Sequence, residues 1–147
     1  MSAATEALER ELRGLRKRLR ESPSHWFAAA APPFPTRAEA AFHVVQRIAH
    51  SAFVREFPGR PMPALTQLPV LALAEQFDVV SGDLLAVIGA DDTLAGSVLA
   101  ELLLHRWQLD GSAPGPAATA VVLAVTGAGD LEAWQRLCAE WPASAKA

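Results

Sequence analysis

The apolar positions of the chain favour helices, and the first helix is predicted over residues 4–21. Leu8, Leu12, Leu15 and Leu19 recur at spacings of four, three and four residues, the rhythm that places side chains on one face of a helix. This stripe covers only about two heptads of a coiled-coil repeat. It therefore predicts a helix that packs either on the rest of the chain or on a second copy of it.

Prolines and capping residues divide the chain further. Thr36 stands three residues before Glu39, the capping-box pattern that starts a helix, and this helix is predicted to run to about Phe57, where a proline-rich stretch follows. Its stripe of Phe42, Val45, Ile48, Ala49, Ala52 and Phe53 is expected to pack in the core. The expected organisation is a basic amphipathic helix (1–22), a Pro/Ala-rich connector (23–35), a helical domain (36–142) and a disordered tail (143–147).

Shorter segments follow from residue 65. Helices are predicted over 65–77, 81–88 and 92–106, with Gly89 as the C-terminal cap of the second. The Val-rich run 119–125 fits either a strand or a helix, because it is short and also rich in Ala. Past a glycine-rich break, a terminal helix is predicted over 131–141, carrying Trp134 and Trp141 on one side.

The stretch VLALAEQFDVVSGDLLAVI, residues 70–88, resembles the helix-turn-helix class of motifs. Ala74 stands at the small position of the first helix, Phe77 and Val79 flank the turn, and Ser81 starts the second helix; Asp78 stands where the class usually has Gly. In a wider register, residues 65–125 are similar to winged-helix domains, with 110–118 as the wing. The resemblance implies a mainly α fold with a helix-turn-helix or winged-helix-like centre and at most one short β-hairpin.

Composition narrows the protein class. The chain has 147 residues and is 51% apolar, but 30 of its residues are Ala, so Leu, Val, Phe and Trp must form the core. Cys138 is the single cysteine, which rules out an internal disulfide and favours a reducing, cytoplasmic compartment. Charged residues at the N-terminus do not fit a secretory signal, and no apolar run is long enough to span a membrane.

Charge is distributed unevenly along the chain. Residues 10–20 carry a net +5, so the rest of the chain carries −8 of the total −3. The outward positions expected for a recognition helix include no Arg or Lys, the residues that contact bases and phosphates. DNA binding would therefore have to use the first helix, through the candidate nucleic-acid-binding residues Arg10, Arg13, Arg16, Lys17 and Arg20.

Catalytic and metal-binding patterns are sparse. Glu39 and His43, like Glu101 and His105, are four residues apart, a spacing that suits helix-stabilising pairs better than a helical metal site. Cys138 has no His or basic residue beside it in sequence and is predicted to be an inert, buried thiol. Phosphate-binding Gly-rich loops and the Gly-x-Ser-x-Gly motif are absent. No enzyme activity, cofactor or metal is expected.

The sequence therefore favours a non-enzymatic regulatory or adaptor protein that acts through protein–protein contacts. We expect a homodimer whose interface residues are Leu8, Leu12, Leu15, Leu19, Trp134 and Trp141. One alternative is a DNA-binding helix-turn-helix regulator that uses the basic helix 10–20. A second alternative is a helical protein that binds a metal or a small molecule.

Overall fold

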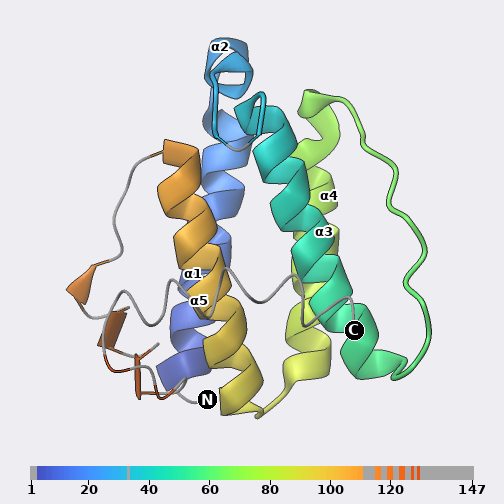
Figure 1. Cartoon of the computed structure of the whole chain (residues 1–147), viewed down its shortest axis with the longest axis vertical. Coiled ribbons are helices and arrows are strands. Elements are labelled where there is room, and N and C mark those ends of the chain that lie inside the picture. Colours follow the sequence, from blue (N-terminus) through green and yellow to red (C-terminus); the bar gives the residue numbers. More distant parts are fainter. Residues whose placement is uncertain are drawn as a thin grey trace. The chain divides into compact units, whose positions relative to one another are not determined.

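The computed structural model describes residues 3–32 and 34–110, together with positions 115, 116, 119, 120, 123, 124, 127 and 129. The fold is mainly α, as predicted (Figure 1). The helices of the described residues are α1 (Ala3–Glu21), α2 (Ser24–Ala28), α3 (Arg37–Glu56), α4 (Val70–Ile88) and α5 (Asp92–Asp110). These residues form no strand; an isolated antiparallel bridge joins Ala31 and Phe34 in the connector.

Several helix ends lie where the capping residues predicted them. The Thr36 hydroxyl accepts a hydrogen bond from the Glu39 amide at 3.3 Å and caps α3. Asp91 caps α5 in the same way, because its carboxylate accepts from the Leu94 amide at 3.0 Å. Gly89 follows α4 with a φ of 55°, a conformation that costs a side-chain-bearing residue more than glycine.

The chain divides into two compact units, and α1 contributes to both. One unit is Leu12–Gly89, and the other is Met1–Glu11 with Ala90–Ala147. Within Leu12–Gly89, α3 and α4 pack together and run in the same direction (Figure 1). The segment 57–69, hereafter the return segment, leads from the end of α3 back to the start of α4.

The return segment is long enough to run back along α3, and its composition favours a non-helical conformation. Its 13 residues include Pro58, Pro61, Pro63 and Pro69, which disfavour helix because proline lacks an amide hydrogen. An extended chain of this length reaches roughly 40 Å, and a helix as long as α3 spans about 30 Å. The segment can therefore cover the full length of α3 without any helix of its own.

The predicted break between residues 77 and 81 is wrong. A single helix, α4, runs without interruption through Asp78, Val79 and Val80, and it begins at Val70 instead of residue 65. The buried positions Leu73, Phe77, Val80, Leu84 and Ile88 explain the continuity, since their spacings of three and four residues keep one apolar stripe in the core. The turn on which the helix-turn-helix resemblance depends is absent from α4.

The region after α5 is described only in part. Helix α5 extends to Asp110, past the predicted end at residue 106. Thr119, Ala120, Leu123 and Ala124 have helical geometry, which decides between the two alternatives at these positions. Most of the predicted wing (110–118) and all of the predicted terminal helix (131–141) lie outside the described residues.

Candidate functional site

Large apolar side chains are exposed in the second half of the unit Leu12–Gly89. Among the described residues, the large apolar side chains that are exposed all lie between positions 54 and 79: Val54, Phe57, Leu68, Val70, Leu71 and Val79. Leu71 is 95% exposed and Val79 is 65% exposed. Isolated exposed apolar residues are ordinary on protein surfaces, but a contiguous group of them indicates an interaction surface.

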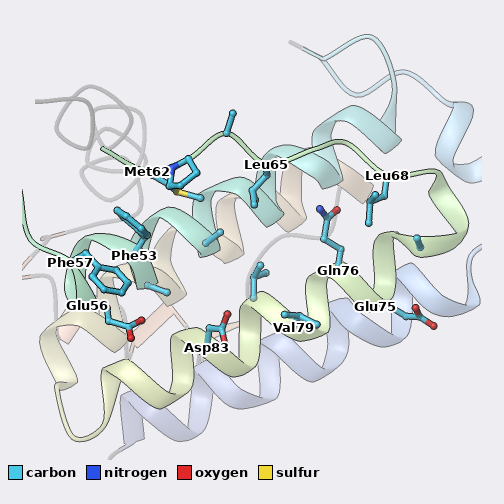
Figure 2. Close-up of a pocket in the computed structure, with 16 residues that line it drawn as sticks. Phe53, Glu56, Phe57, Met62, Leu65, Leu68, Glu75, Gln76, Val79 and Asp83 are labelled. Carbon is cyan, nitrogen blue, oxygen red and sulfur yellow. The ribbon is translucent and has the colours of Figure 1, made fainter. Parts of the chain in front are cut away.

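Three of these residues, Phe57, Leu68 and Val79, line a groove of about 670 Å³ (Figure 2). Helix α3 contributes Ala49, Ala52 and Phe53, while the return segment contributes Met62 and other apolar residues. The α4 side is formed by residues at helical spacing: Ala72, Gln76, Val79, Val80 and Asp83. Figure 2 shows the labelled side chains of α4 below those of the return segment, with Phe53 and Phe57 at one end.

Small side chains keep the groove open. Ala49, Ala52, Ala64 and Ala72 line it, and each carries a single methyl group where a leucine would fill more of the space between the helices. The return segment is attached to α4 partway along its length, because the Gln76 Nε2 donates a hydrogen bond to the Thr66 carbonyl at 3.1 Å. The groove therefore has two helical sides and a third that is held in place by this bond.

The polar rim of the groove is acidic. Glu56, Glu75 and Asp83 line it, and all are exposed. None of these carboxylates forms an ion pair with another described residue. No lysine or arginine is among the described lining residues. The guanidinium of Arg60, in the return segment, lies 5.9 Å from the centre of the Phe57 ring.

The predicted interface leucines lie elsewhere and are buried. Leu8, Leu12, Leu15 and Leu19 are each at most 4% exposed within the single chain. They are therefore core residues, and their use between two copies, which stays a prediction, would require α1 to detach. Trp134 and Trp141 lie outside the described residues.

The predicted nucleic-acid-binding residues separate into two groups. Arg16 forms an ion pair with Asp78 of α4 at 3.2 Å. The other four, Arg10, Arg13, Lys17 and Arg20, are exposed and form no ion pair with a described residue. Their spacings of three, four and three residues place them on one face of α1, roughly opposite the leucines.

The Glu/His pairs form no metal centre among the described residues, where no group of three His, Cys, Asp or Glu is suitably placed. His105 and Glu101 are buried on α5 and lie 3.3 Å apart. In the same unit, Arg106 donates to the Glu11 carboxylate at 3.1 Å. On α3, the His43 ring lies 5.0 Å from the Phe34 ring. These contacts stabilise the fold and leave no set of free ligands, and Cys138 lies outside the described residues.

Sequence reasoning missed the groove, although the sequence contains a signal for it. Ala72, Gln76, Val79 and Asp83 recur at spacings of four, three and four residues, which defines a second stripe on α4 beside the buried one. Val79 is the informative residue of this second stripe. It is apolar but does not belong to the buried stripe of α4, so a second apolar surface on the helix is indicated.

Comparisons with known proteins add no family. No protein-family model matches the chain, and no curated protein or solved structure is detectably similar to it. None of the described helices has both the length and the apolar character needed to cross a membrane.

Proposed function

We propose that this chain is a non-enzymatic adaptor that binds an apolar segment of another protein in the groove between α3, α4 and the return segment. One observation supports the proposal best: Val79 lines the groove, and its side chain is 65% exposed. An exposed valine gains about 1.5–3 kcal/mol when it is fully buried. A partner that covers it supplies that burial.

The groove has the features of a protein-binding surface. Its apolar lining and polar rim match the usual anatomy of interfaces, in which an apolar centre is surrounded by polar groups. The aromatic rings of Phe53 and Phe57 at one end offer large apolar contacts of the kind that dominate binding energy. None of the described lining residues is a His or Cys, so the groove lacks the usual nucleophile and base of covalent catalysis.

A synthetic peptide tests the proposal. The probe is a fluorescein-labelled amphipathic helix of about 18 residues, or five turns, with leucines on one face and glutamines on the other. Val79→Gln should weaken its binding at least about tenfold, since about 1.4 kcal/mol corresponds to that factor. Leu71→Gln is the matched control, because Leu71 lies on the same helix but does not line the groove. Equal binding by both variants would exclude the groove as the binding site.

A second candidate function is DNA binding by α1. The exposed face of Arg10, Arg13, Lys17 and Arg20 favours it, since these cations extend over about 15 Å of helix. Contact of all four with phosphates predicts a slope of log K against log[salt] of about −3.6. Because α4 has no central turn, the helix-turn-helix element of this hypothesis has no support in the described residues.

Duplex binding tests this second candidate directly. Anisotropy of a labelled duplex, measured over a range of NaCl concentrations, should give the predicted slope for the unmodified chain. Replacement of Arg10, Arg13, Lys17 and Arg20 by Gln should bring the slope close to zero. Absence of duplex binding at about 50 mM salt, where phosphate contacts are strong, would remove the candidate.

A further inference from the structure

We infer that the partner segment is an amphipathic helix with a basic polar face, contributed by a different protein. This inference rests on the proposed function and specifies the chemistry of the occupant. The supporting observation is the negative charge of the rim. Glu56, Glu75 and Asp83 are exposed around an apolar lining that includes no described lysine or arginine.

The rim places negative charge toward both ends of the groove. Figure 2 shows Glu56 and Asp83 near Phe53 and Phe57, and Glu75 nearer the end that contains Leu68. A bound segment with Lys or Arg on its flanks meets a carboxylate near each end, and an acidic segment meets like charge there. Such rim charges contribute mainly to the rate of association and to the choice of partner.

The shape of the groove favours a helix over an extended peptide. The α4 residues that line it run from Ala72 to Asp83, which corresponds to about 16 Å, or three turns of helix. Two of its sides are helices, whose backbone groups are already paired within α3 and α4, so these two sides offer no strand edge for an extended peptide to join. On the third side, Pro61, Pro63 and Pro69 of the return segment lack the amide hydrogen that strand pairing needs. Helix-in-groove recognition uses apolar anchors at i, i+3 or i+4, and i+7, and about three turns accommodate that set.

Two segments of the chain itself are poorer occupants. Helix α1 has a basic polar face, but its leucine stripe, Leu8 to Leu19, is already buried. Residues 131–141 carry two tryptophans, yet their charged residues are Glu132, Arg136 and Glu140, which gives a net −1 beside an acidic rim. Charge complementarity therefore favours another protein over a second copy.

Three peptides that differ only in charge test the inference. Each has the same leucine stripe over about 18 residues, with Lys, Gln or Glu on the polar face, and binding to the full chain is followed by fluorescence anisotropy. At low salt the Lys peptide should bind at least about tenfold more tightly than the Glu peptide, because three weak rim pairs act together. The preference should shrink at about 0.5 M NaCl, where exposed charges are screened.

Two charge variants locate the source of the preference. The triple variant Glu56→Gln, Glu75→Gln and Asp83→Asn should remove it. The control variant Glu6→Gln, Glu9→Gln and Glu21→Gln changes the net charge equally on α1, at residues that do not line the groove, and should retain it. Circular dichroism establishes that both variants are folded.

The other possible results separate the basic-partner inference from the proposed function. Equal binding of the three peptides, tightest binding of the Glu peptide, or equal effects of the two triple variants would refute the basic-partner inference. The proposed function would survive those results if binding still depended on Val79, and it fails if Val79→Gln has no effect on any peptide. A homodimer that Val79→Gln dissociates, measured by light scattering, would identify a second copy as the occupant and also refute the inference.

Discussion

Replacing Ala72 with Leu should stabilise the protein while closing its groove. Ala72 lines the groove and is only partly exposed, and Ala→Leu is nearly neutral for helix propensity. The three added carbons would gain about 2.4 kcal/mol if fully buried, at about 0.8 kcal/mol each. Because the groove is open on one side, about half of that, roughly 1 kcal/mol, is expected. A change of this size raises the Tm by about 2–4 °C for a chain of this length.

Thermal unfolding and peptide anisotropy on the same variant provide the assay. Ala72→Leu should raise Tm and weaken binding of the leucine-stripe peptides together. The matched control is Ala86→Leu, at an exposed α4 position that does not line the groove, which should change stability by no more than about 0.5 kcal/mol. A fall in Tm would show that the space is too small for the side chain. A rise in Tm with unchanged binding would refute the groove as the binding site.

Four further predictions address the fold. Leu15→Ala should lower the free energy of unfolding in urea by about 2–5 kcal/mol, because Leu15 is buried; a changed molar mass in light scattering with unchanged stability would place it in an interface instead. Gly82→Ala should raise stability by about 0.5–1 kcal/mol, since a Cβ there meets no atom within 4 Å in α4. Gly89→Ala should lower stability, because φ there is positive. Stability changes of the same sign for the two glycine substitutions would contradict a helix that continues through Gly82. For Arg16 and Asp78, a double-mutant cycle should give about 0.2–1 kcal/mol at low salt and a much smaller value in 1 M NaCl; a salt-independent value would contradict an exposed ion pair.

Local sequence signals were sufficient to predict α1 and the starts of α3 and α5. The leucine stripe predicted α1, and Thr36 and Asp91 mark the starts of α3 and α5 through short hydrogen bonds. Each of these signals lies within or next to a single helix. They are therefore readable without knowledge of the packing.

The helix break was predicted wrongly within α4 because the same residue types occur at helix starts and inside helices. Ser81, Gly82 and Asp83 resemble a helix start, yet Ser81 lies on the buried side of an unbroken helix. The buried stripe from Leu73 to Ile88 outweighs that local preference, because burial stabilises more than a cap contributes. The helix-turn-helix resemblance depended on the same ambiguous residues.

The groove could not be predicted from the sequence, because it depends on how distant segments pack together. Phe53 belonged to the predicted core stripe of α3, but its side chain lines a surface groove together with residues of α4 and the return segment. The path of the return segment decides which apolar residues are covered. That path follows from the parallel packing of α3 and α4, a long-range arrangement that periodicity within either helix cannot reveal.

Partner binding at this groove can be observed residue by residue. The most direct measurement is a titration of the isotopically labelled full chain with the Lys peptide, followed by ¹⁵N–¹H correlation spectra. We expect saturable shifts that map to the second half of α3, the return segment and α4, with Val79 among the most affected amides. Shifts confined to the Arg10–Arg20 face of α1, or no saturable shifts at all, would contradict binding at this groove.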